Sequence, residues 1–261
     1  MSDAPVSYSS YLALDELLAA QRPRSDEHDE LLFIIIHQVS ELWFKELLHE
    51  LAFAQARMEA GDATAALATL RRVLAILKTL VGQMDVLETL TPRQFAAFRD
   101  RLGPASGFQS AQFRELEAVL GARDRRVLAL HPEGSEARAA VEAAMARPAL
   151  FDSLLMFLAA EGYAVPQDVL ARDVRAAYEG DEGVQAALLS VYADEGLAAQ
   201  LCERMVDLDE GVQEWRYRHV KLIERTIGAK AGTGGSSGAD FLARTLFRPA
   251  FPDLWAVRSR L

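Results

Sequence analysis

Residues 25–51, SDEHDELLFIIIHQVSELWFKELLHEL, decide the fold, because they predict one long helix near the start of the chain. Ser25 or Asp26 can cap its N-terminus. Asp29 and Glu30 place acidic groups in the first turns, where they interact favourably with the positive end of the helix dipole. The rest of the chain can therefore be arranged around a long helix with a defined beginning.

A single polar residue, His37, follows the apolar run at residues 31–36 in this helix. A helix carries residues i and i+4 on one face, so His37 shares a stripe with Phe33 and with Glu41 or Phe44. The helix alone leaves two interpretations open. His37 is a core histidine paired with a carbonyl, which is the commoner arrangement, or it faces a dry pocket as a hydrogen-bond partner or metal ligand.

Composition limits the classes of function. The chain has 261 residues, is 51% hydrophobic and carries a formal net charge of -10 without a Lys/Arg cluster, which argues against nucleic acid or an anionic membrane as a partner. The N-terminus lacks the pattern of a signal peptide, and the longest apolar run is too short to span a bilayer. We therefore expect a cytoplasmic protein.

Cys202 is the one cysteine of the chain. It excludes an internal disulfide and a zinc or iron–sulfur site built from several cysteines. A haem with a thiolate ligand stays possible, although a lone cysteine in a helix is more often a small core residue.

The remaining sequence predicts further helices, because Leu, Val and Ile recur at three- and four-residue spacing and no run alternates like a strand. Residues 122–134 are loop-like, and 163–181 are mixed. The Gly/Ser-rich stretch 232–238 is too short and too internal to link two domains. We expect an all-α fold, a single-domain helical bundle over residues 1–261. The predicted helices span residues 11–21, 25–60, 63–90, 91–102, 108–121, 135–147, 148–162, 181–194, 195–228 and 240–247.

Two short motifs have weak functional interpretations. Glu46 and His49 fit the Glu-x-x-His pattern of di-iron bundles, but the required second copy is absent from the sequence. The stretch GTGGSSG at 232–238 follows a predicted helix rather than a strand, so it lacks the context of a nucleotide-binding loop. Its backbone N–H groups can still surround an anion, and a flexible surface loop is the alternative.

Two further side chains suggest a pocket. Arg99 follows Phe95 and Phe98 on one predicted helix, as a surface ion pair or as a bidentate clamp for a substrate carboxylate. His219, like His37, lies on an apolar helix face, which it shares with Trp215 and with Leu222 or Ile223. Two such histidines, an arginine and an anion-binding loop suggest a site for a planar cofactor and an acidic small molecule.

Five blocks carry a resemblance to a known family: SYSSYLALDELLAAQ, HDELLFIIIHQVSELWFKELLHEL, FRDRLGPASGFQSAQFR, WRYRHVKLIERTIGAKAGTGGSSG and FPDLWAVRSRL. Along nearly its whole length the sequence resembles the tryptophan 2,3-dioxygenase family. The resemblance implies an all-α homotetramer with an internal pocket for haem b. It also implies an oxidoreductase of tryptophan catabolism by the kynurenine pathway, which inserts O2 across the indole C2–C3 bond of L-tryptophan to give N-formylkynurenine.

The resemblance also implies roles for individual residues. His219 matches the proximal ligand of the haem iron, and His37 matches the distal histidine over the indole N–H. Phe33 matches an aromatic wall of the indole pocket, and Arg99 matches the residue that holds the substrate carboxylate. The other implied positions are Leu102 and Thr233 at the substrate, Ser106 and Gly107 at the haem-pocket turn, and Tyr8, Tyr11 and Leu12 in an N-terminal segment, residues 1–24, that reaches a neighbouring subunit's site.

One position departs from the family, since Met84 stands where the family usually has Trp on the haem side. A flexible thioether packs less rigidly than an indole. This leaves open a monooxygenase of the same fold that converts tryptophan or a methylated tryptophan to a 2-oxindole without ring opening. A non-enzymatic haem sensor is a second alternative, but it needs only His219 and leaves Arg99 and Thr233 without a substrate to hold.

Overall fold

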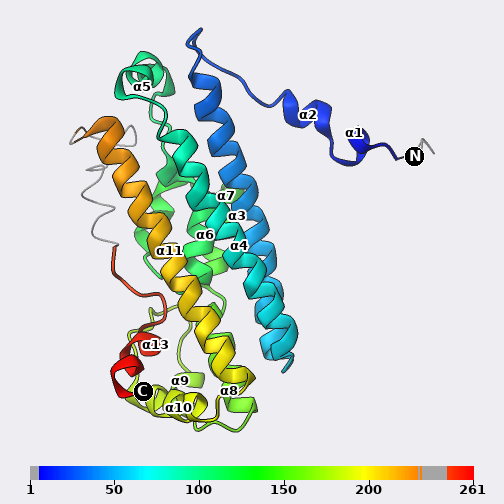
Figure 1. Ribbon diagram of the computed structural model, residues 1–261, viewed down its shortest axis with the longest axis vertical. Helices are drawn as coiled ribbons and strands as arrows, with labels where there is room; N and C mark the ends of the chain where they lie inside the picture. The colour runs from blue at the N-terminus through cyan, green and yellow to red at the C-terminus, as the bar shows by residue number, and fades with distance from the viewer. Residues whose placement is uncertain (1–5, 229, 231–245) are drawn as a thin grey trace.

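Three long helices form the frame of the molecule. The structure is a computed structural model that describes residues 6–228, 230 and 246–261, and its regular elements are all helical. Helices α3 (Glu30–Glu59), α4 (Ala63–Leu87) and α11 (Leu197–Ile227) run side by side, with α4 in contact with both of the others (Figure 1). The prediction of an all-α fold is confirmed.

Shorter helices close the ends of this frame and one of its sides. Helix α5 (Pro92–Arg99) lies at the end where α3 begins, whereas α8 (Leu150–Ala160) lies at the opposite end (Figure 1). Helix α6 (Ala111–Val119) packs against α3 and against α7 (Glu136–Met145). The remaining elements are α9 (Gln167–Leu170), α10 (Glu182–Ala193), α13 (Pro252–Ala256), and the 3-10 turns η1 (Asp100–Leu102), η2 (Gly107–Gln109), η3 (Arg125–Leu130) and η4 (Val257–Arg260).

The apolar faces of these helices meet in a main core that lies towards the end of the frame opposite α5. Leu51 of α3, Leu70 of α4, Leu154 of α8 and Leu201 of α11 are completely buried in it. Each such side chain contributes roughly 1.5–3 kcal/mol on burial. By contrast, no residue of α3 from 31 to 43, a range that the structure describes in full, is buried. This main core therefore holds one half of α3, whereas Phe33 on the other half packs against a smaller buried cluster of Leu90, Phe95 and Phe98.

The beginning of α3 differs from the prediction. The helix begins at Glu30, not near Ser25, and its N-cap residue Asp29 makes no side-chain capping bond. Instead, the carboxylate of Glu30 is buried and accepts hydrogen bonds from the backbone N–H groups of Arg24 (2.9 Å) and Ser25 (2.8 Å) and from the Ser25 hydroxyl (2.5 Å). An acid in the first turn thus fastens the preceding segment to the helix.

Two other segments also differ. The helix predicted at 11–21 is two short helices, α1 (Tyr8–Tyr11) and α2 (Leu14–Leu18), because Ala13 between them has a φ of 48° in the left-handed region. The loop predicted at 122–134 contains η3. The helix predicted at 240–247 lies largely outside the described residues. Helix α5 begins with a capping box formed by Thr91 and Gln94.

By length and hydropathy, the stretch Glu136–Ala160 is apolar enough to cross a membrane. It consists of two helices, α7 and α8, rather than one. More than half of its most apolar window, 56%, is buried inside the protein. The apolar residues of this stretch are therefore explained by their place in the core.

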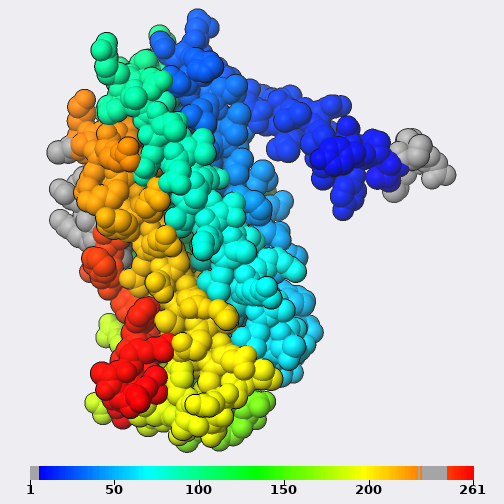
Figure 2. All heavy atoms as spheres, viewed as in Figure 1, coloured from blue at the N-terminus to red at the C-terminus, as the bar shows by residue number. Residues whose placement is uncertain are grey.

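The N-terminal arm, residues 6–24, extends away from the bundle from the beginning of α3 (Figures 1 and 2). Helices α1 and α2 contain no buried residue. Tyr8 and Tyr11 are 77% and 78% exposed. Large apolar and aromatic side chains are therefore presented to the surroundings of this chain.

Candidate active site

A cavity of about 260 Å³ lies between α3, α4 and α11, at the end of the bundle covered by α5. The half of α3 without buried residues forms one wall. Side chains of α11 form the facing wall, and the turns η1 and η2 close the rim. The apolar stripes predicted around His37 and around His219 both line this cavity, so the two histidines belong to one site.

His37 faces the cavity and is not a core residue, although it has the carbonyl partner that the core interpretation expected. Its Nδ1 lies 2.7 Å from the backbone carbonyl oxygen of Phe33, and since a carbonyl oxygen can only accept, Nδ1 carries the proton. The other nitrogen, Nε2, is then an unprotonated acceptor. Burial by the surrounding protein lowers the pKa of His37, so the ring is neutral near pH 7, although its surface stays accessible through the cavity.

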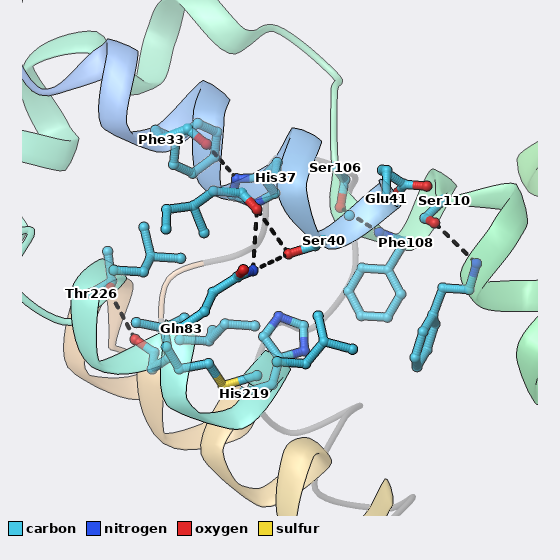
Figure 3. Close-up of a pocket in the computed structure, with 18 of the residues that line it drawn as sticks. Phe33, His37, Ser40, Glu41, Gln83, Ser106, Phe108, Ser110, His219 and Thr226 are labelled. Atoms are coloured by element: carbon cyan, nitrogen blue, oxygen red, sulfur yellow. Dashed lines mark hydrogen bonds between the residues drawn. The ribbon is translucent and has the colours of Figure 1, made fainter. Parts of the chain in front are cut away.

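His219 reaches the cavity from α11. Its ring centroid lies 5.1 Å from that of Trp215, one turn earlier on the same face. Burial, with smaller contributions from the nearby His37 and Arg114, lowers the pKa of His219 to about 4. The imidazole is therefore a neutral nitrogen donor with a lone pair available. Figure 3 shows His37 and His219 on facing sides of the pocket with Gln83 between them.

Phe33 belongs to an aromatic cluster at one end of the cavity. Its ring centroid lies 4.1 Å from that of His37 and 5.6 Å from those of both Phe95 and Phe98. Phe98 is completely buried. Because the cluster is anchored in this way, Phe33 presents a fixed aromatic surface beside His37.

Five more of the predicted site residues also line the cavity. Arg99 is the last residue of α5 rather than a residue in mid-helix, and Leu102 ends the η1 turn that follows. Ser106 accepts a hydrogen bond from the backbone N–H of Phe108 (3.4 Å) and so begins the η2 turn, with Gly107 next to it. Met84 of α4 is 6% exposed and lies in the wall.

Three predicted site residues are not brought to this cavity within one chain, and a fourth cannot be placed. Tyr8, Tyr11 and Leu12 lie on the arm and are absent from the cavity lining formed by the described residues. Thr233 lies outside the residues that the structure describes. The cavity of one chain thus contains the histidines and Arg99 but not the N-terminal residues.

A sequence model of the tryptophan 2,3-dioxygenase family matches residues 1–140 and 147–261. The chain belongs to the tryptophan 2,3-dioxygenase family. A curated relative named tryptophan 2,3-dioxygenase, from Anaeromyxobacter sp. (strain K), is 64% identical over 258 residues, which are 99% of this chain and 97% of the relative.

More distant family members give the same result. Relatives named tryptophan 2,3-dioxygenase from Herpetosiphon aurantiacus and Caulobacter vibrioides are 53% and 47% identical, over 100% and 98% of both chains. The family predicted from the sequence is confirmed, and with it the expectation of a haem-dependent tryptophan dioxygenase. The monooxygenase and the haem sensor are not favoured.

Sequence reasoning missed a charged group in the wall of this cavity. Glu117 of α6 accepts from Arg114 on the same helix (2.5 Å) and from Arg216 on α11 (3.2 Å). Arg216 lies three residues before His219, so helical spacing was a usable signal for it. The link to Glu117 joins helices distant in sequence and could not be read locally.

Two polar residues beside His37 were also missed. Ser40, three residues after His37, donates to the Ile36 carbonyl (2.8 Å), and Gln83 of α4 donates to the Ser40 hydroxyl (2.5 Å). Both line the cavity. Ser40 could have been found from its spacing to His37, whereas Gln83 carries no comparable sequence signal.

Proposed function

We propose that this chain inserts both atoms of O2 across the indole C2–C3 bond of L-tryptophan and releases N-formylkynurenine. The observation that carries the proposal is that His37 and His219, from separate helices, line the same cavity, with Arg99 at its rim. The reaction is balanced without another reductant, because the product is tryptophan plus one O2. We propose that the whole chain acts as one haem-binding domain.

The donor chemistry of the cavity fits haem b. Among the residues that the structure describes, no group of three His, Cys, Asp or Glu side chains could hold a bare metal ion. His219 is a single neutral nitrogen donor, which suits an iron whose porphyrin supplies four further ligands. When bound, the haem supplies the activation of O2. We propose His219 as the iron ligand.

The cavity walls also suit the rest of this cofactor. Met84 and Trp215 contribute apolar surface for a flat macrocycle. The two arginines Arg114 and Arg216 share the single carboxylate of Glu117, so these three groups carry a net charge of +1. A net positive wall favours the propionates of haem b. Ser106 and Gly107 form the turn at the same rim.

The other site residues would orient the substrate. His37 Nε2 can accept a hydrogen bond from the indole N–H, since its Nδ1 donates to Phe33. Indole N–H is a very weak acid, so His37 acts here as an acceptor and positioning group rather than as an obligatory base. Phe33 and Leu102 supply apolar contact to the ring. Arg99 supplies a planar fork for the carboxylate.

Tyr8, Tyr11 and Leu12 would complete the site of a neighbouring subunit in a homotetramer, and Thr233 would contact the amino-acid end of the substrate. The exposed arm supports this arrangement, because its apolar side chains have no burial within their own chain. Net charge and composition support a cytoplasmic enzyme whose partners are tryptophan, O2 and its own copies, with neither nucleic acid nor membrane among them.

The test is anaerobic reconstitution with haem, followed by tryptophan and O2. We expect the absorbance of N-formylkynurenine and a product mass that increases by two oxygen atoms, both derived from labelled O2. A mass increase of one oxygen atom without ring opening would instead identify the 2-oxindole reaction that Met84 leaves open. Haem binding without any change in tryptophan would identify a sensor.

A further inference from the structure

The half of α3 that carries His37 has little core packing, because Phe33 packs against the cluster of Leu90, Phe95 and Phe98 but no residue of this half beyond Glu30 is itself buried. From residue 31 to 43, all of them described, α3 has no buried residue, whereas burial resumes at Phe44 and Leu47. A helix segment that borders a cavity lacks apolar neighbours on that side, so other interactions must fix its distance from the opposite wall. Two glutamines from different helices supply such interactions.

Gln83 attaches α4 to this half of α3. Its Nε2 donates to the Ser40 hydroxyl (2.5 Å) and to the Ile36 carbonyl (3.3 Å), and Ser40 donates to the same carbonyl (2.8 Å). Ile36 directly precedes His37. Figure 3 shows the amide of Gln83 joined by both bonds to the turn of α3 that carries His37.

Gln112 attaches α6 to the next turn. Its Nε2 donates to the backbone carbonyl of Glu41 (2.9 Å) and to the Glu41 carboxylate (2.9 Å). Glu41 lies four residues after His37 and lines the same cavity. The two amides therefore hold α3 just before and just after His37, from two different helices.

We propose that Gln83 and Gln112 are positioning residues that clamp this half of α3 and thereby set where His37 meets the indole N–H. The proposal rests on the role proposed for His37. Each clamp is a set of hydrogen bonds to main-chain or side-chain oxygens of α3, so its loss lets the helix shift. Gln112 is absent from the cavity lining, so its loss removes no group from the pocket, whereas Gln83 and Ser40 also line the cavity. A small misplacement of a positioning group is enough to lower the rate.

The test compares the kcat/KM ratio of tryptophan to 1-methyltryptophan, which lacks the indole N–H, in haem-loaded variants. We expect Gln83→Met and Gln112→Met each to lower this ratio about 2- to 10-fold, the typical effect of losing one hydrogen bond. Ser40→Ala should behave like Gln83→Met, and Ser40→Thr, which keeps the hydroxyl, should restore the ratio. Amide hydrogen exchange should increase in residues 31–43 and stay unchanged in 44–59.

Gln55 provides the matched control. It lies on the other half of α3 and donates to the Pro148 carbonyl (3.1 Å) and to the Ser153 hydroxyl (3.1 Å). None of these three residues lines the cavity. Gln55→Met should lower the melting temperature and leave the substrate ratio unchanged. A ratio that follows the melting temperature across all variants would overturn the proposal.

His37→Ala distinguishes failure of the clamp from failure of the role proposed for His37. If it lowers the ratio while both glutamine variants keep the wild-type ratio and wild-type exchange, the clamp is overturned and the role of His37 stands. If His37→Ala itself keeps the wild-type ratio, the role proposed for His37 is overturned, and the clamp with it. Should Gln83→Met fail to fold, Ser40→Ala and Gln112→Met decide the outcome.

Discussion

His219 and His37 line one cavity and have different proposed roles, although burial lowers the pKa of both. His37 has one nitrogen committed to a carbonyl of its own helix. His219 faces the cavity from α11 as the proposed iron ligand. The roles proposed for them, acceptor for substrate and donor for metal, therefore differ through their surroundings rather than through residue type.

We expect His219→Ala to abolish stable haem binding, because the proposed ligand to the iron is removed. The measurement is the Soret absorbance and the haem-to-protein ratio after reconstitution. His49→Ala is the matched control, since His49 lies exposed on α3 outside the cavity lining and should leave haem content unchanged. A His219→Ala protein with a full Soret band and unchanged stoichiometry would remove His219 from its proposed role.

Arg99→Ala should raise KM for tryptophan about 10- to 100-fold, because a charge-assisted hydrogen bond contributes roughly 1.5–3 kcal/mol. Arg99→Lys should recover little, since a lysine lacks the planar fork. Steady-state kinetics measures both. Arg101→Ala, an exposed arginine on the adjoining turn outside the cavity lining, is the control. Wild-type enzyme that oxidises tryptamine as well as tryptophan would contradict this role.

At the scale of single elements, α3 combines two kinds of helix. One half is held by side chains such as Leu51 in the core, and the other borders the cavity and has its beginning fixed by Glu30. Burial alone would raise the pKa of Glu30, but hydrogen bonds from Ser25 and the Arg24 backbone, together with the charge of Arg24, lower it overall below its ordinary value of 4.5.

Glu30→Gln should therefore destabilise the fold by about 1–3 kcal/mol at neutral pH, the typical contribution of hydrogen bonds to a charged group. Because the folded pKa is lowered, this contribution is complete above pH 4.5 and is lost as the pH falls through the lowered folded value. Denaturant unfolding of both proteins between pH 3 and 7 measures it. A stability difference that persists unchanged at the acid end would contradict the role of the charge.

At the scale of the whole molecule, the arm and the cavity belong to different parts of one chain. No residue of the two helices of the arm is buried, and Tyr8, Tyr11 and Leu12 expose large side chains to solvent. Ordering such a segment costs conformational entropy that its own chain does not repay. A neighbouring copy is the proposed source of that burial.

Deletion of residues 1–23, which keeps the Arg24 N–H that Glu30 binds, should leave the helical fold intact but abolish the proposed tetramer and reduce kcat/KM by at least about 10-fold, because each site would lose apolar contacts supplied by its neighbour. Light scattering after size exclusion, circular dichroism and kinetics measure the three properties. Tyr8→Ala with Tyr11→Ala in the full-length chain tests the contacts alone. A deletion variant that stays tetrameric with wild-type kinetics would rule out the exchange of arms.

Local spacing in the sequence was enough to define most of the helices and the faces on which the site residues lie. Helical periodicity involves only near neighbours in the chain, so it could place Phe33 with His37 on one stripe and Trp215 with His219 on another. The family resemblance then assigned Arg99, which its neighbours alone left as a clamp or a surface ion pair. These inferences needed only spacing within one helix or one family motif.

The packing of the helices was needed to bring both stripes to one cavity and to select the polar groups that hold it. Gln83, Gln112 and the Glu117–Arg216 pair act between helices that are distant in sequence. The predicted start of α3 at residue 25 was wrong for a related reason. Ser25 does not cap the helix; its backbone N–H instead donates to the side chain of Glu30, where the helix begins. Contacts of this kind depend on how helices pack, and packing is set by the complementary shape of whole faces rather than by any local pattern.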